Sequence, residues 1–351
     1  MPAIAVTGAS GLVGQRLLPL LAADASVERV VALDVREPQS RSAKITFHRV
    51  DIAGTDLRPV LAGVDVVVHL AGVVDPIPDE GLMTRVNVEG TRRVLAAAAE
   101  VGVRKIVRVS SATVYGAWPN NPLPLREDAP LRPNGAFSPA VQGAEVERLL
   151  AEWRADHDGV VVTTLRSAAV VGPGAERLPA RILLGRPPLR VRGASMPVQV
   201  VHVDDLASAL ALVAIDDLPG VYNVAADGWL DADAARALLP GTRVPAFPQE
   251  SLERALHRTW ELGIGDVPAG VVPYLMQPCV IGNDKLREAG WTPRHTNADA
   301  IAEALATLPP RHLARTGAIV AAAGGAVVVA GITGTLVRRH RRAKRHEPAS
   351  K

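Results

Sequence analysis

The chain has 351 residues, of which 48% are hydrophobic and 21% charged, as in a globular protein with a substantial core. Aromatic residues make up only 3%, so Ala, Val and Leu must fill that core. The single cysteine, Cys279, excludes an intramolecular disulfide and a metal site built from several cysteines, and we predict no metal site. The net charge of +3 comes from a basic stretch near the C-terminus, so we predict no nucleic-acid partner.

Short apolar runs alternate with helical stretches through the first half of the chain. The Val and Ile runs are apolar on every face, as parallel strands covered by helices on both sides should be. This alternation predicts an α/β fold with a Rossmann-type doubly wound parallel sheet. The predicted strands are 3–7, 30–34, 45–49, 66–70, 105–110 and 160–165, and the predicted helices are 11–23, 57–62, 86–101 and 140–157.

A glycine-rich turn follows the first predicted strand. Its three glycines have the spacing that allows a tight turn, a close approach to a pyrophosphate and the packing of a helix on a strand. The N-terminus of the following helix favours the negative phosphates. We therefore predict a dinucleotide site that includes Thr7, Gly8, Ser10, Gly11, Leu12, Val13 and Gly14.

Asp34 ends the second predicted strand, where a carboxylate can accept hydrogen bonds from an adenosine ribose. It would repel a 2′-phosphate, which favours NAD over NADP, although Arg36 works against this preference. The turns after the next two strands lie at the same edge of the sheet. There we expect the cofactor to meet Asp51 and Ile52, then Leu70, Ala71 and Gly72.

The chain beyond residue 165 is more irregular, because several prolines interrupt the stretch 171–198. We predict a Rossmann domain over 1–165 and a small irregular C-terminal substrate lobe over 166–308. The lobe is expected to be interleaved with the last elements of the sheet, and 309–315 to be a linker.

Residues 316–337 carry no charge and are followed by a basic tail over 338–351. At roughly 1.5 Å per residue such a helix spans a hydrocarbon core of about 30 Å. We expect a C-terminal transmembrane helix, a cell-membrane location with the Rossmann domain facing the cytoplasm, and lipid contact through helix and tail. The positive-inside bias would place the tail in the cytoplasm too. Because a single span cannot leave both of its ends on the same side, a re-entrant hairpin remains an alternative. The small residues Gly317, Ala321 and Gly325 would allow a homodimer.

Residues 109–116, Val-Ser-Ser-Ala-Thr-Val-Tyr-Gly, resemble the extended short-chain dehydrogenase/reductases of the NAD-dependent epimerase/dehydratase group, and UDP-galactose 4-epimerases most closely. The resemblance continues through Leu-Arg at 165–166, His-Val-Asp-Asp-Leu at 202–206 and Tyr-Asn-Val at 222–224, and covers about 1–308. It implies that Ser111 hydrogen-bonds the reacting oxygen, that Tyr115 and Arg166 meet a small-molecule substrate, and that Arg166 faces a phosphate.

The chain departs from the family where the family carries Tyr-xxx-Lys on the next helix. If Glu147 is the acid that often follows the lysine, Pro139 and Gly143 stand at the two positions; one residue earlier they are Ser138 and Gln142. Neither pair transfers protons at neutral pH. Two functions stay open: an enzyme of non-standard mechanism acting on a nucleotide-sugar or lipid-linked substrate, and an inactive NAD(H)-binding sensor or scaffold.

Overall fold

The computed structural model describes residues 1–175, 177–184, 189–238 and 246–307. Its centre is a seven-stranded sheet in the order β3-β2-β1-β4-β5-β6-β9, in which all neighbours are parallel. The order reverses at β1, so a crevice opens between the carboxyl ends of β1 and β4. The strands are β1 (Ala3–Thr7), β2 (Arg29–Asp34), β3 (Ile45–Arg49), β4 (Val66–His69), β5 (Lys105–Ser111), β6 (Val161–Ser167) and β9 (Gly220–Val224).

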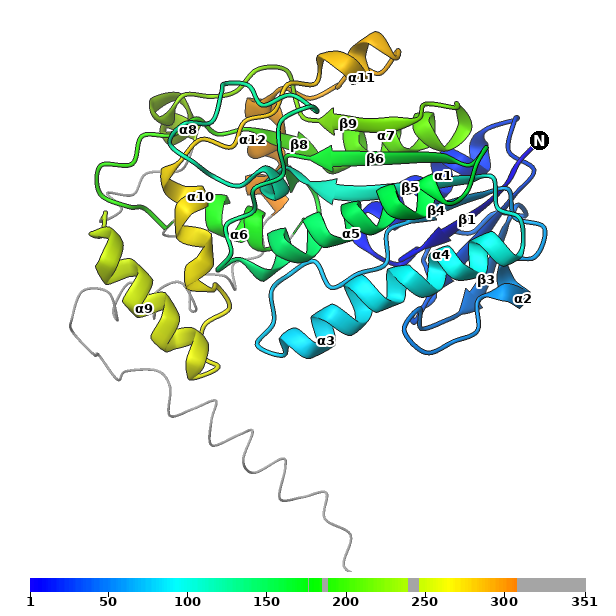
Figure 1. Cartoon of the computed structure of the whole chain (residues 1–351). Coiled ribbons are helices and arrows are strands. Elements are labelled where there is room, and N and C mark those ends of the chain that lie inside the picture. The colour runs from blue at the N-terminus through cyan, green and yellow to red at the C-terminus, as the bar shows by residue number, and fades with distance from the viewer. Residues whose placement is uncertain (176, 185–188, 239–245, 308–351) are drawn as a thin grey trace, which may run out of the picture.

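Helices cover both faces of this sheet, as Figure 1 shows with α4 and α5 in front. One core packs beneath α4 and α5 and the other beneath α1 and α7, which explains why the strands are apolar on both faces. The predicted Rossmann-type sheet is therefore confirmed. The helical elements of this half are α1 (Leu12–Ala23), α2 (Arg58–Leu61), α3 (Glu80–Thr84), a π-helical turn (Arg85–Glu89), α4 (Gly90–Glu100), a 3-10 turn (Ala112–Tyr115), α5 (Ser138–Ala155) and α7 (Val203–Ile215).

A second lobe lies beyond the carboxyl ends of β5, β6 and β9, at the left of Figure 1. It has two small cores of its own. The chain leaves the sheet after β6 and returns to it for β9. The division into a Rossmann domain over 1–165 and an interleaved lobe over 166–308 stays a prediction. The elements of the second lobe are β7 (Ala169–Val171) and β8 (Val200–His202), which pair with each other, with α6 (Leu178–Leu184), α8 (Ala232–Leu238), α9 (Gln249–Glu261), a 3-10 turn (Ala269–Val271), α10 (Val272–Met276) and α12 (Asn297–Thr307), whereas α11 (Asp284–Glu288) packs against β9 of the sheet.

The expected transmembrane helix, and the cell-membrane location that rested on it, require correction. Among the residues that the structure describes, no helix has both the length and the apolar character needed to cross a membrane. The segments 309–315, 316–337 and 338–351, on which the linker, the helix and the tail were predicted, lie outside the described residues.

A buried ion pair joins α5 to the sheet. Arg166 on β6 donates through Nη2 to Glu147 of α5 at 2.7 Å and through Nε at 3.0 Å, and both side chains are only 6% exposed. Arg166 also donates to the Tyr115 hydroxyl at 2.8 Å, and that hydroxyl donates to Asn223 on β9 at 2.8 Å. Ser110 on β5 donates to the same Glu147 carboxylate at 2.5 Å. One carboxylate thus links α5, β5 and β6.

Replacing Glu147 with alanine should lower the free energy of unfolding by about 3–5 kcal/mol, because Arg166 would be left as a buried, unpaired charge. The measurement is urea denaturation followed by circular dichroism. Glu145→Ala is the matched control, since Glu145 lies on the same helix and its pair with Arg148 is exposed; it should cost less than about 1 kcal/mol. Equal losses in the two variants would show that the buried pair is not a main stabilising contact.

Candidate functional site at the carboxyl edge of the sheet

A cavity of about 450 Å³, here called the long cavity, follows the carboxyl ends of the strands. It begins at the glycine-rich loop after β1 and reaches Ser111 at the end of β5. The structure brings together here all but one of the residues predicted for the cofactor. They are Gly8, Ser10, Gly11, Leu12, Val13, Gly14, Asp34, Asp51, Ile52, Leu70, Ala71 and Gly72.

The loop after β1 needs glycine at two positions for steric reasons. Gly8 has φ +70°, and a Cβ there would lie 2.6 Å from the Ala71 backbone nitrogen. A Cβ at Gly14 would lie 2.5 Å from the Gly8 carbonyl oxygen. Any larger residue at Gly8 or Gly14 would push α1 or the turn after β4 away, and the long cavity would lose its shape.

The N-terminus of α1 opens into the long cavity with free hydrogen-bond donors. Gly11 caps the helix without a side-chain hydrogen bond, and the buried Ser10 hydroxyl has no partner among the described residues. The Ser10 backbone N–H donates to Asp34 at 2.9 Å, which holds that carboxylate at the edge of the loop. The arrangement suits an anionic group over the helix and a hydroxyl-bearing group beside Asp34.

Thr7 is the predicted cofactor residue that does not line the long cavity. Its hydroxyl lies 2.7 Å from Nδ1 of His69 and accepts from the Ala71 N–H at 3.2 Å, while Nε2 of His69 lies 3.0 Å from the Thr91 hydroxyl. Burial, aided by the charge of Arg108, lowers the pKa of His69 well below its usual value. Thr7 therefore supports the turn after β4 from beneath, through a neutral histidine.

The predicted helix 86–101 contains a polar residue, Asn87, and its hydrogen bonds explain its position. It sits in the π-helical turn, accepts from the Val73 N–H at 2.7 Å and donates to the Val73 carbonyl at 3.0 Å. It also donates to Gln142 of α5 at 2.9 Å. Asn87 therefore fixes the loop after β4 to α5, across the middle of the long cavity.

Ser111 lies where the long cavity meets a second cavity of about 320 Å³, here called the apolar cavity. Its oxygen accepts from the Thr113 N–H at 3.2 Å and from the Thr113 hydroxyl at 3.0 Å, which leaves its own proton free for a ligand oxygen. Ser111 therefore has a hydroxyl proton available at the junction of the two cavities, and its contact with a reacting oxygen stays a prediction. The walls of the apolar cavity come mainly from the second lobe and include Ile182, Leu189, Val191, Val271 and Leu275.

The α5 face over the long cavity carries no charged side chain at the positions of the family's pair. Pro139, Gln142 and Gly143 line the cavity, and Gln142 is held by Asn87 and, through Nε2, by Thr84 at 3.1 Å. Ser138 turns toward Glu80. In either register, the two positions of the family's pair offer the cavity no charged side chain and no titratable group.

The three lysines in the described part of the chain all lie outside the long cavity. Lys105 begins β5 and bonds to Asp217, about 20 Å from Ser111 at roughly 3.3 Å per residue. Lys44 bonds to carbonyls near the start of β2, and Lys285 lies 4.4 Å from the centre of the Tyr222 ring. A lysine from elsewhere in these residues does not replace the one missing from α5.

Tyr115 and Arg166, predicted to meet substrate, line neither cavity. Tyr115 is 1% and Arg166 5% exposed, and both are engaged in the Glu147 network. Burial raises the pKa of Tyr115 to about 12, so the phenol stays neutral. Both side chains thus have structural contacts here, and the expected substrate contact stays a prediction.

Three residues of the cavities were missed at the sequence level. Arg108 and Gln142 line the long cavity, and Tyr274 lines the apolar cavity and donates to the Thr113 carbonyl at 2.8 Å. Burial raises the pKa of Tyr274, so it can donate a hydrogen bond but is a poor base. In the sequence, the only signal for Arg108 was a charged side chain in the middle of a predicted strand, between Val107 and Val109.

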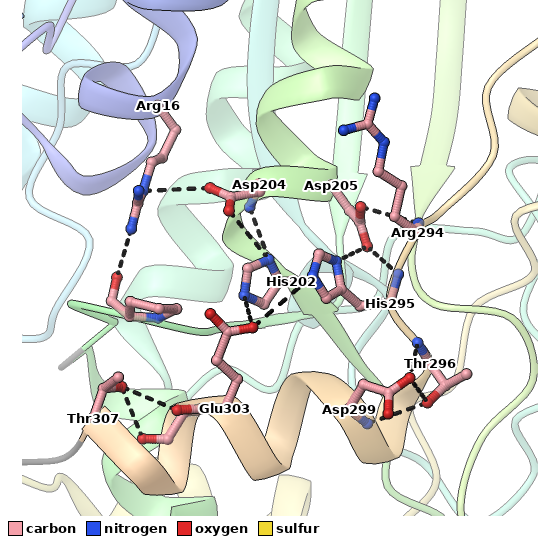
Figure 2. A network of polar contacts seen from close by, with 12 residues as sticks. Arg16, His202, Asp204, Asp205, Arg294, His295, Thr296, Asp299, Glu303 and Thr307 are labelled. Carbon is pink, nitrogen blue, oxygen red and sulfur yellow. Dashed lines mark hydrogen bonds and ion pairs between the residues drawn. The ribbon is translucent and has the colours of Figure 1, made fainter.

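A separate polar cluster at the end of β8 joins α7 to α12 (Figure 2). Nε2 of His202 lies 3.5 Å and Nε2 of His295 3.9 Å from the Glu303 carboxylate, and the two rings stack with centroids 3.8 Å apart. These atoms lie close enough for a metal ion. However, Nδ1 of His202 accepts from the Asp204 N–H at 3.2 Å, so the neutral ring carries its proton on Nε2 and offers no lone pair there. We assign the cluster a structural role.

Comparison with known proteins identifies the family. The family model described as "NAD dependent epimerase/dehydratase family" matches residues 4–225. A dTDP-glucose 4,6-dehydratase of Streptomyces griseus is 31% identical over 242 residues, which cover 62% of this chain and 72% of that protein. An uncharacterised protein of Mycobacterium tuberculosis is 29% identical over 316 residues, covering 85% and 81%. The UDP-glucose 4-epimerase of Thermus thermophilus, solved with NAD, has a TM-score of 0.65 at 22% identity, covering 87% and 98%, and shares the fold.

Protonation of His202 should destabilise the protein. Burial and then the charge of His295 lower its pKa, against the opposing effect of Asp204, Glu303 and Asp205. The unfolded chain, with a histidine pKa near about 6.5, then binds the proton more readily, so this contribution is full above that pH and is lost as the pH falls below it. We expect the melting temperature to fall between pH 7.5 and 5, and to fall less steeply in His202→Asn.

Asparagine keeps an acceptor for the Asp204 N–H, so α7 retains its cap. His257→Asn is the control, because His257 is exposed on α9; it should leave the slope unchanged. If the melting temperature of His202→Asn falls with pH as steeply as that of the parent, His202 does not cause the fall, and the buried His69 is the remaining candidate.

Proposed function

This chain belongs to the NAD dependent epimerase/dehydratase family, and from that premise we propose that the long cavity binds NAD and that the protein performs redox chemistry on a small-molecule alcohol or ketone. One observation carries the proposal. The glycine loop, Asp34 and the turns after β3 and β4 line a single cavity that ends at the Ser111 hydroxyl. Those residues fit a dinucleotide, with phosphates over α1 and the adenosine ribose at Asp34.

Bound NAD would supply the hydride acceptor or donor. The protein's own residues orient the groups around the reacting carbon. The Ser111 hydroxyl donates to the substrate oxygen, since its lone pairs already accept from Thr113. When an alcohol is oxidised, its C–H hydrogen leaves as hydride to the cofactor and its O–H proton must leave to a base or to water. Without a Tyr-xxx-Lys pair on α5, we expect that proton transfer to be slow.

Nucleotide sugars are the substrate class that the comparisons support. The relatives' names include a dTDP-glucose dehydratase and a UDP-glucose 4-epimerase. In this chain the sugar would lie at Ser111 and the nucleotide in the apolar cavity. Arg190 and Arg236 are charged members of that lining and suit a diphosphate. Most of the remaining wall is apolar and suits the face of a base.

Cofactor binding should be detectable by calorimetry on the full chain. We expect NAD and NADH to bind with micromolar affinity and NADPH more weakly, because Asp34 would repel a 2′-phosphate. Gly11→Asp should abolish binding, since its carboxylate would occupy the phosphate position. Gly54→Asp is the matched control, because a side chain at Gly54 meets open space; it should bind as the parent does. Absence of NAD and NADH binding in the parent would refute the proposed function.

Turnover should depend on Ser111. We expect the full chain with NAD to convert a UDP- or dTDP-sugar slowly, and Ser111→Ala to lower that rate by about 100-fold through loss of one hydrogen bond to the reacting oxygen. Chromatography of the sugar products gives the rate. Calorimetry on the same variant should show unchanged NADH affinity. Tight cofactor binding without turnover of any sugar in the panel would instead support the non-catalytic NAD(H)-binding alternative.

A further inference from the structure

Arg108 brings a positive charge into the long cavity from beneath. It lies on β5, three residues before Ser111, and its backbone pairs with His69 at the end of β4. Its side chain points to the same face as α5 and lines the cavity together with Gly143 and Glu147. No sequence motif singles it out, because β5 also carries Lys105, Ser110 and Ser111, and a charged residue in this strand is not distinctive.

The guanidinium of Arg108 is poorly satisfied by the protein alone. Nη1 donates to the His69 carbonyl at 3.1 Å, while the buried Nε has no partner among the described residues. The nearby carboxylate of Glu147 is already bonded to Arg166 and Ser110. Burial outweighs the attraction of Glu147 and lowers the pKa of Arg108 to about 10. A buried cation with spare donors is costly unless further acceptors arrive.

Gly72 leaves this cation open to a ligand. A Cβ at Gly72 would lie 3.1 Å from the Asn87 amide oxygen and 3.9 Å from Nη2 of Arg108. Because glycine has no side chain, a molecule that passes over the turn after β4 can approach both groups. This point lies between the glycine loop, where the phosphates are expected, and Ser111, where the chemistry is expected.

We propose that Arg108 is the cofactor-binding cation of this protein, donating to the hydroxyls of the ribose next to the nicotinamide and standing in for the charge that α5 lacks. The inference rests on the proposed function, because it needs NAD in the long cavity. Gly143 of α5 lines the same cavity as Arg108 without a side chain, and Asn87 donates to Gln142, another residue of that lining. The positive charge near the cofactor thus comes from strand β5 and not from helix α5.

A positive charge here distinguishes the two redox states of the cofactor. Oxidised nicotinamide is cationic and the reduced ring is neutral, so Arg108 should disfavour NAD⁺ relative to NADH. Charges several ångströms apart in a partly solvated site interact by about 1 kcal/mol, or roughly fivefold in affinity. Loss of Arg108 should therefore weaken NADH binding more than NAD⁺ binding. A residue that only stabilises the end of β4 would not change this ratio.

The test is calorimetric titration of the full-length Arg108→Met and Arg108→Lys proteins with NADH and with NAD⁺. For Arg108→Met we expect NADH affinity to fall at least tenfold and the preference for NADH over NAD⁺ to fall about fivefold. Arg108→Lys keeps the charge and should retain most of the preference, even though it loses hydrogen bonds. Arg104→Met removes an arginine just before the other end of β5, where it pairs with Asp65, and should bind as the parent does.

Two results would overturn the inference while leaving the proposed function intact. One is parent-like NADH affinity in Arg108→Met. The other is an equal loss for both redox states, in a variant that still melts cooperatively, which would leave Arg108 with a structural role only. If Arg108→Met does not fold, Arg108→Gln, which removes the charge but keeps a polar side chain, is titrated in its place, and an unchanged ratio of NADH to NAD⁺ affinity in that variant overturns the inference. If the parent itself binds neither nucleotide, the proposed function fails, and this inference with it.

Discussion

The buried pair of Arg166 and Glu147 is the contact on which the geometry of the site depends. Two charges removed from water are stable only when both are fully hydrogen-bonded, and here Tyr115 and Ser110 supply the remaining bonds. The pair fixes the rotation and height of α5 over β5 and β6. The preceding residues of α5 that face the long cavity, Pro139, Gln142 and Gly143, are therefore placed by a contact further along the same helix.

That constraint determines which side chains α5 and β5 present to the long cavity. With Glu147 held by Arg166, the preceding turns of α5 present Pro139, Gln142 and Gly143 to the cavity. These residues can close the site and anchor the loop after β4, but they supply no charge and no titratable proton. The polar groups toward the nicotinamide end come instead from β5, as Arg108 and Ser111. A family architecture is preserved while its chemical groups come from a different element.

Much of the cofactor half was predictable, because local sequence determines it. The strand, the glycine turn and the helix are adjacent in the chain, and Gly8 and Gly14 are required by contacts within the motif or with the next parallel strand. Asp34 follows from its place at a strand end. The contacts of Tyr115 and Arg166 with Asn223 and Glu147 were not predictable, because these partners are distant in sequence, and the substrate role of the two residues stays a prediction. Thr7 faces His69 for the same reason.

By itself, the sequence determined the doubly wound sheet, the position of the dinucleotide loop and the family, since these follow from apolar periodicity and from motifs whose residues are neighbours in the chain. The tertiary structure decided which polar residues are free to act. Arg166 is bound by a carboxylate, whereas Arg108, an arginine on the adjacent strand, lines a cavity and has a buried Nε without a partner among the described residues. The two cannot be told apart by residue type or by position along a strand. The difference lies in the partners that distant segments bring to each side chain, and only the packed fold brings those segments together.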